Sequence, residues 1–167
     1  CSFFRINCGV RKNFNPMTLL EINTQFKTVT DAISGLNGYS FGWPSDRTRS
    51  QTYDAPGEDQ ADLYPRVLFA VPTLDHDMTQ RNDTYQCQVF FDDLLGYDDD
   101  GEANTDTQVV KWSTLITYAE RWVKDMQGYI TTGKVQGTVN FTLDSFALQR
   151  RVITVIASFT FVTKATC

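Results

Sequence analysis

A long amphipathic helix is the feature that most constrains this chain, and it is predicted over residues 106–127. Apolar side chains recur there at steps of three and four residues, which places them on one face of a helix. They are Val109, Trp112, Leu115, Ile116, Ala119, Trp122, Val123 and Met126. Asp106 or Thr105 is suited to cap the first turn, and Gly128 follows the last one. A helix of this length spans about 33 Å, which is enough to cross the whole sheet of a small domain.

A second helix is predicted over residues 18–34. Its apolar side chains also step by three and four residues, and they are Leu19, Ile22, Phe26, Val29 and Ile33. Thr18 and Glu21 have the spacing of a capping box, in which each residue's side chain accepts a hydrogen bond from the other's backbone N–H. Gly35 is expected to stop the helix.

Alternating apolar side chains predict that most of the remaining chain is β-strand. The predicted strands are 39–43, 64–74, 85–91, 135–143 and 152–162. Prolines near both ends of the second run suggest an edge or strand ends, and the polar connector after it suggests an antiparallel hairpin. The last run is apolar on one face and mixed on the other, so we expect it to be a central strand.

These elements predict an α+β fold in the order α-β-β-β-α-β-β. Two helices are expected to pack on one face of a mostly antiparallel sheet of four to five strands. The length of 167 residues suits one domain with a real core, which we assign to residues 17–167. Residues 1–16 contain three basic side chains and no acidic one, and we interpret them as an N-terminal arm or leader.

Composition excludes two classes of protein. The net charge of −5 and the pI near 4.7 argue against a protein that grips nucleic acid through a basic face. The apolar runs are too short for a transmembrane helix. We therefore expect a soluble protein with no membrane partner.

The four cysteines leave two interpretations open. Cys87 lies within an alternating strand pattern, which favours a buried free thiol in a reducing compartment. The alternative is a secreted, disulfide-containing binding module with glycans at the sequons of Asn82 and Asn140. Residues 1–16 lack the apolar segment of a secretory signal, so we favour the first interpretation.

No catalytic motif is present in the sequence. It contains no G-x-S-x-G element and no glycine-rich phosphate loop, and its single histidine is His76. Asp75, Asp77 and Asp92 flank strands, so together with His76 they could form a metal site at one end of the sheet. A metal-dependent enzyme that uses these four residues is the less favoured alternative. We predict no enzymatic activity, no cofactor and no metal.

Two further groups of residues are candidates for an interface or for the wall of a channel. The first is an acidic loop with Asp98, Asp99, Asp100 and Glu102. It does not match a calcium-binding EF-hand loop, because the first position is not an acid and the twelfth is not Glu. The second lies in the long polar segment 36–62, and its candidate residues are Trp43, Arg47, Arg49 and Tyr53. Their mixture of aromatic rings and arginines is typical of a protein interface.

Several strings within residues 17–167 point to a family. The chain contains MTLLEINTQFKTVTDAIS, then YPRVLFAVPTL, and then YQCQVFFDDLLGYDDD, in which a strand runs through acids toward the second helix. It ends with the helix DTQVVKWSTLITYAERWVKDM and the strand VITVIASFTFVTKATC. In these strings and their order it resembles the tail-terminator, tail-completion and neck-ring proteins of tailed bacteriophages.

The resemblance implies a structural virion protein that assembles in the cytoplasm of the host bacterium. Such a protein would form a closed ring, sixfold or twelvefold, at the head–tail junction, where it caps or joins the tail. Its partners would be further copies of itself and other neck, connector or tail-tube proteins. DNA would pass through the lumen without specific binding, and an acidic rim at Asp98, Asp99 and Asp100 would help the DNA to slide.

Overall fold

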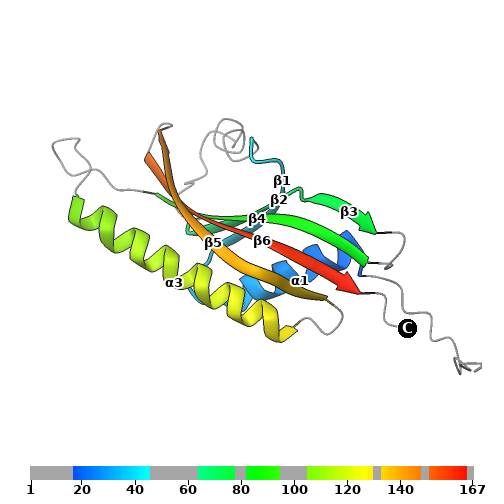
Figure 1. Ribbon diagram of the computed structural model, residues 1–167. Helices are drawn as coiled ribbons and strands as arrows, with labels where there is room; N and C mark the ends of the chain where they lie inside the picture. The colour runs from blue at the N-terminus through cyan, green and yellow to red at the C-terminus, as the bar shows by residue number, and fades with distance from the viewer. Residues whose placement is uncertain are drawn as a thin grey trace, which may run out of the picture.

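The computed structural model describes residues 17–45, 64–77, 82–94, 105–129, 133–147 and 151–164. These residues form two helices, α1 (Leu19–Asp31) and α3 (Thr105–Tyr129), and a sheet of six strands. The strands are β1 (Gly38–Gly42), β2 (Arg66–Ala70), β3 (Thr73–Asp77), β4 (Asn82–Leu94), β5 (Gly133–Ala147) and β6 (Arg151–Lys164). Both helices lie on one face of a curved sheet (Figure 1). The predicted α+β architecture is confirmed.

The sheet is mixed, with the order β1-β2-β4-β6-β5 and with β3 paired to β4. β1 and β2 are parallel, and the other neighbouring strands are antiparallel. β6 lies between β4 and β5, and the central position predicted from its apolar face and its mixed face is confirmed. α1 packs under β1 and β2, whereas α3 packs under β4, β5 and β6.

The predicted number and order of strands need a correction at Pro72. The predicted strand 64–74 is divided into β2 and β3, and both of these pair with β4. Pro72 lies between them and has no N–H for the ladder, so the strand is interrupted there. The N–H of Val71 instead donates to the carbonyl oxygen of Gly42 at 2.9 Å. The observed order is therefore α-β-β-β-β-α-β-β, with six strands rather than four or five.

The core lies between the helices and the sheet. The buried face of α3 consists of Leu115, Ala119, Trp122 and Met126, each with no exposed surface. Their steps of four, three and four residues bring them to one side of the helix. Val109 was predicted on the same stripe, but its side chain is 57% exposed. It lies about 120° around the helix from Leu115 at 100° per residue, so it points away from the core.

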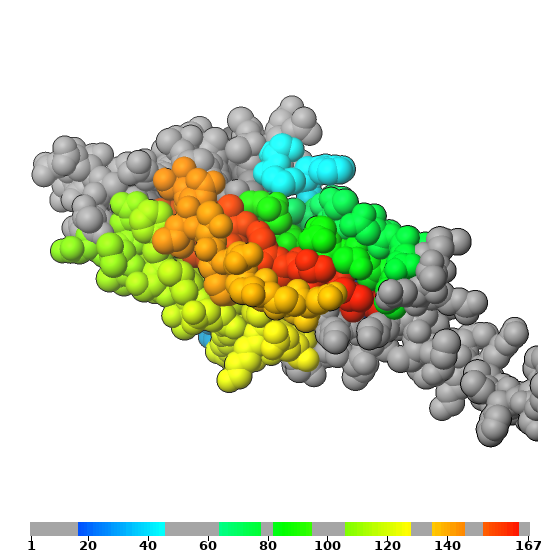
Figure 2. Space-filling model, in the orientation of Figure 1, coloured from blue at the N-terminus to red at the C-terminus, as the bar shows by residue number. Residues whose placement is uncertain are grey.

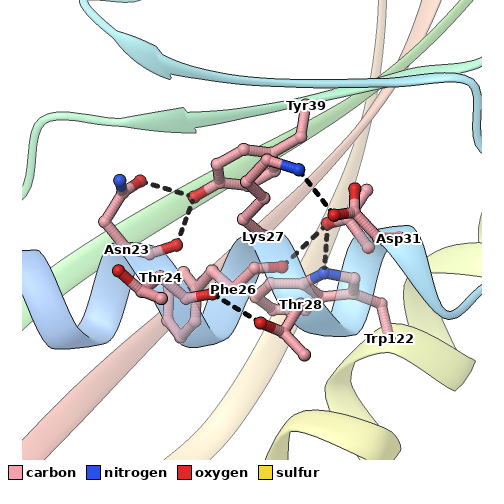
Figure 3. A network of polar contacts seen from close by, with 9 residues as sticks. Asn23, Thr24, Phe26, Lys27, Thr28, Asp31, Tyr39 and Trp122 are labelled. Carbon is pink, nitrogen blue, oxygen red and sulfur yellow. Dashed lines mark hydrogen bonds and ion pairs between the residues drawn. The ribbon is translucent and has the colours of Figure 1, made fainter.

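Polar contacts tie the two helices and β1 together (Figure 3). The indole N–H of Trp122 donates to the Thr30 hydroxyl at 3.0 Å, and that hydroxyl donates to the Phe26 carbonyl oxygen at 2.9 Å. The Tyr39 hydroxyl of β1 donates to Asn23 Oδ1 of α1 at 2.8 Å. These bonds satisfy polar groups inside an otherwise apolar layer.

The predicted capping box of the first helix is present. The Thr18 N–H donates to Glu21 Oε2 at 2.7 Å, and the Glu21 N–H donates to Thr18 Oγ1 at 3.3 Å. The hydrogen bonds from Thr18 hold the pKa of the Glu21 carboxyl below its usual value. The start of α1 is therefore set by local sequence.

Candidate functional site

β5 is an edge strand of the sheet, and it lies at the end of the sheet that α3 covers. Among the described residues its partner is β6, so its outer backbone groups meet no other described strand. β5 extends over 15 residues. A long edge strand with free N–H and C=O groups is a template for pairing with another chain.

A bulge shapes β5 near its middle. Gln136 pairs with Thr160 and Asn140 pairs with Ser158, so three residues of β5 stand opposite a single residue of β6. Gly137 lies at the start of the bulge with φ of +80°, a conformation that favours glycine. Bulges bend a strand and increase its twist. Across the bulge β5 contains two more residues than β6. Because this number is even, side chains of β5 after the bulge still point to the same face as their partners on β6.

Two large apolar residues after the bulge lie on the helix side of the sheet but are poorly covered. Phe141 is opposite Ala157 and Leu143 is opposite Val155, and both partners are fully buried. Yet Phe141 is 38% exposed and Leu143 is 49% exposed. The helices therefore do not cover this part of the sheet completely.

The adjoining flank of α3 adds further apolar surface. Val109 is exposed and Trp112 and Ile116 are half-buried, and at 100° per residue all three lie on one flank of the helix. β5 and the first turns of α3 lie side by side on the molecular surface (Figure 2). We call this surface the β5–α3 edge patch. It consists of Phe141, Leu143, Val109, Trp112 and Ile116.

The start of α3 is held in place by one lysine. Lys111 Nζ lies 3.0 Å from Asp93 Oδ2 and donates to the Leu94 carbonyl oxygen at 2.6 Å. Both acceptors belong to the end of β4. This contact fixes the first turns of α3 against the sheet, so the edge patch has a defined shape.

The edge patch contains an unusual polar atom. Trp112 Nε1 is buried and, within the described part of the chain, has no hydrogen-bond partner. A buried N–H without an acceptor costs about 1–3 kcal/mol, and most such groups are satisfied in folded proteins.

One residue predicted as part of an interface, Trp43, lies away from the edge patch. Trp43 follows β1, at the opposite edge of the sheet from β5, and is 61% exposed. The other predicted interface and channel residues lie outside the described ranges. They are Arg47, Arg49, Tyr53, Asp98, Asp99, Asp100 and Glu102.

The structure does not bring the alternative metal ligands together. Asp75, His76 and Asp77 are exposed on β3, and the His76 ring pairs with Asp83. Asp92 lies nine residues further along β4 from Asp83, a distance of about 30 Å in an extended strand. The described residues contain no group of three or more side chains placed to hold a metal ion.

Asp92 is instead part of a buried polar group on the helix-free face. Its carboxylate accepts a 2.7 Å hydrogen bond from the Thr154 hydroxyl and lies 3.8 Å from Arg66 Nε. Asp92 and Thr154 have no exposed surface. The carboxylate is thus paired with a charge and with a hydroxyl donor, as a buried charge requires.

Cys87 is a buried free thiol, as its strand pattern predicted. Its Sγ is 3.7 Å from the Tyr85 carbonyl oxygen, and burial raises the pKa of the thiol to about 12. A thiol with so high a pKa is a poor nucleophile. Of the two sequon asparagines, Asn82 is half-buried and Asn140 is exposed on β5.

The sequence indicated the edge patch only indirectly. Phe141 and Leu143 share the alternation of core residues, and Val109 shares the helical stripe, so pattern alone assigns all three to the core. One feature of the sequence did point to the edge patch. The stripe of apolar side chains on α3 extends around more of the helix than one sheet can cover.

Comparison with known proteins adds no family assignment. No family model matches the chain, and no curated protein matches it. Within the described residues, neither helix is both long enough and apolar enough to cross a membrane. A function for this chain must therefore be argued from its geometry and from the resemblance of its sequence.

Proposed function

We propose that this protein is a structural virion protein of a tailed bacteriophage that forms a closed ring at the head–tail junction. The ring caps or joins the tail and lets DNA pass. The observation that carries the assembly step is the β5–α3 edge patch, where Phe141 and Leu143 of β5 are exposed and the outer edge of β5 meets no other described strand. The place in the virion follows from the sequence resemblance described above.

The positions of the two sheet edges favour a ring. The edge patch lies at β5, whereas β1 and β3 lie toward the other side of the sheet. If the patch of one copy meets the opposite side of the next copy, the contact is heterologous, and a heterologous contact that closes produces a ring. If the patch met itself, the assembly would be a twofold dimer instead.

Strand pairing and apolar burial would act together at such a contact. The outer edge of β5 supplies backbone N–H and C=O groups, and the patch supplies apolar area beside it. Each square ångström of apolar surface buried contributes about 25 cal/mol.

The proposed partners are other neck, connector or tail-tube proteins. DNA would pass through the lumen without specific binding, which agrees with the net charge of −5. The acidic segment with Asp98, Asp99, Asp100 and Glu102 is the proposed rim of the lumen. Replacing Asp98, Asp99 and Asp100 by lysine is expected to stall tail joining or genome ejection.

The oligomeric state of the purified full chain tests the proposal. Native mass spectrometry and electron microscopy are expected to show closed rings of six or twelve copies. A monomer at high protein concentration, or a dimer that does not grow, would contradict ring formation. Virions that infect normally with the three lysine substitutions would contradict the proposed lumen rim.

A pair of valines on the same helical turn provides a matched variant and control. Val109 belongs to the edge patch, and Val110 is 64% exposed but points away from it at 100° per residue. Val109→Asp combined with Leu143→Asp is expected to give folded monomers by circular dichroism and native mass spectrometry. Val110→Asp is expected to leave the rings intact. Equal effects of both changes would show that the patch is not the contact.

A further inference from the structure

A groove crosses the helix-free face of the sheet. It has a volume of about 640 Å³ and runs from the end of β1 across β4 and β6 to β5. In the space-filling view, β4 and β6 reach the surface between the end of β1 and β5 (Figure 2). Its lining includes Trp43, Gln86, Gln88, Asn140, Ser158 and Thr160.

Strand register arranges the floor of this groove in two rows. Asn140, Ser158 and Gln88 are directly opposite one another on β5, β6 and β4. Gln86 and Thr160 form the second row on β4 and β6. Directly opposed residues on one face have Cβ atoms about 4.5–5.5 Å apart, so the rows present amides and hydroxyls at short, regular intervals.

The floor retains hydrogen-bonding capacity. The Thr160 hydroxyl donates to Gln86 Oε1 at 3.0 Å, which orients that amide and leaves its two N–H donors to face other groups. The side chains of Gln86, Gln88 and Asn140 are exposed. An amide offers two donors and an acceptor, so this surface can both donate to and accept from a ligand hydroxyl.

Among the described residues, those that line the groove carry no charged side chain. Apart from the amides and hydroxyls, it consists of alanine, valine, proline, cysteine and aromatic residues. Phosphates and carboxylates would find no cation here, and cations would find no carboxylate. The chemistry therefore matches a neutral ligand with many hydroxyl groups.

One wall of the groove is aromatic. Trp43 lies beside Pro44 at the end of β1, and its side chain is 61% exposed. A flat ring with an apolar face packs well on the C–H face of a sugar ring, while hydroxyls at the sugar's edge remain free to bond to amides. An aromatic wall beside an amide and hydroxyl floor is suited to that pairing.

We propose that this groove binds a neutral oligosaccharide, with Trp43 stacking on one sugar ring and Gln86, Gln88 and Asn140 bonding to its hydroxyls. The volume lies within the usual range of ligand sites, which is about 300–1,000 Å³. The groove is on the helix-free face and the edge patch is on the helix side, so this inference does not depend on ring formation.

The test uses the full chain and named probes. Cellohexaose, maltohexaose and chitohexaose are titrated by isothermal calorimetry, with a heparin hexasaccharide as the charged comparison. At least one neutral hexasaccharide is expected to bind with a dissociation constant of about 10 μM–1 mM, and the heparin fragment more weakly. If all three neutral probes fail to bind at about 5 mM, or the heparin fragment binds best, the proposal is overturned.

Variants locate the binding. Trp43→Ala and Gln88→Ala each change an exposed residue, and each is expected to weaken binding about tenfold or more. Leu74→Ala is the matched control, because Leu74 is 51% exposed on β3 and does not line the groove. Thermal unfolding of each variant shows that the fold is retained. Wild-type affinity in both groove variants would contradict the assigned site.

Discussion

The indole N–H of Trp122 donates a 3.0 Å hydrogen bond to the hydroxyl of Thr30, and both side chains are buried. Trp122 belongs to α3 and Thr30 to α1, so a polar contact joins the two helices inside the apolar layer. The Trp122 ring also packs edge-on against Phe26, with 4.9 Å between the ring centroids. Since a hydrogen bond is directional, this contact sets the register of one helix against the other.

Thr30→Val is expected to destabilise the protein by about 1–3 kcal/mol. Valine has nearly the shape of threonine but cannot accept from the Trp122 indole, which leaves a buried donor unsatisfied. Urea unfolding measures the change. Thr28→Val is the control, because the Thr28 side chain is exposed and bonds only to the Thr24 carbonyl within its own helix at 2.9 Å. Equal small effects would show that the interhelical bond contributes little.

Asp92→Ala is expected to cost about 3 kcal/mol or more of folding free energy. The change removes the carboxylate that pairs with Arg66 and accepts from Thr154 inside the sheet, and removing one partner of a buried ion pair is strongly destabilising. Asp125→Ala removes a more exposed helical pair with Arg121 and is expected to cost about 0.3–0.5 kcal/mol. Chemical denaturation compares the two, and similar costs would contradict the role of burial.

Gly35→Ala is expected to destabilise the fold more than Gly137→Ala does. Both glycines have positive φ, of +99° and +80°, which costs about 1 kcal/mol for alanine. At Gly35 the added Cβ would also collide with Tyr118, whose hydroxyl is the nearest atom and whose Cζ would be 2.9 Å away. At Gly137 an added Cβ would meet nothing within 4 Å.

A double variant separates backbone strain from the collision. Tyr118→Phe removes the atom nearest to the added Cβ, so it is expected to restore part of the stability lost in Gly35→Ala. Thermal unfolding of the two single variants and the double variant gives the coupling between the sites. If the two changes are simply additive, the collision is not the cause.

The stability contributed by the Cys87 thiol is expected to decline above pH 9. Burial raises its pKa from 9.0 to about 12, so the folded protein holds a proton that the unfolded chain releases between these values. The contribution is complete below pH 9 and falls by about 1.4 kcal/mol per pH unit as the pH rises toward 12.

Cys87→Ala isolates this effect from other groups. Burial also raises the pKa values of Tyr39 and Tyr85, so both proteins are expected to lose stability at high pH. The measured quantity is the difference in unfolding free energy between wild type and Cys87→Ala. It is expected to shrink between about pH 9 and pH 11. A difference that stays constant over that window would show that the thiol does not titrate as described.

Elements whose signals are local could be predicted from the amino-acid sequence. The apolar spacing of α1 and α3 predicted both helices, and the Thr18–Glu21 capping box set the start of α1. Alternation identified most of the strands, and the combination of an apolar face and a mixed face predicted the central position of β6. These signals are local because helix and strand periods are properties of consecutive residues.

Which apolar residues are covered depends on how the helices and strands pack in three dimensions. Val109 and Leu143 carry the same pattern as core residues, yet Val109 points away from the core on α3 and Leu143 lies on a part of β5 that the helices do not cover completely. The groove likewise depends on β4, β5 and β6 being in register, because it brings Gln88, Ser158 and Asn140 from three separate strands into one row. Coverage and register are set by contacts between distant segments, and a periodic pattern in one segment contains no information about its neighbours.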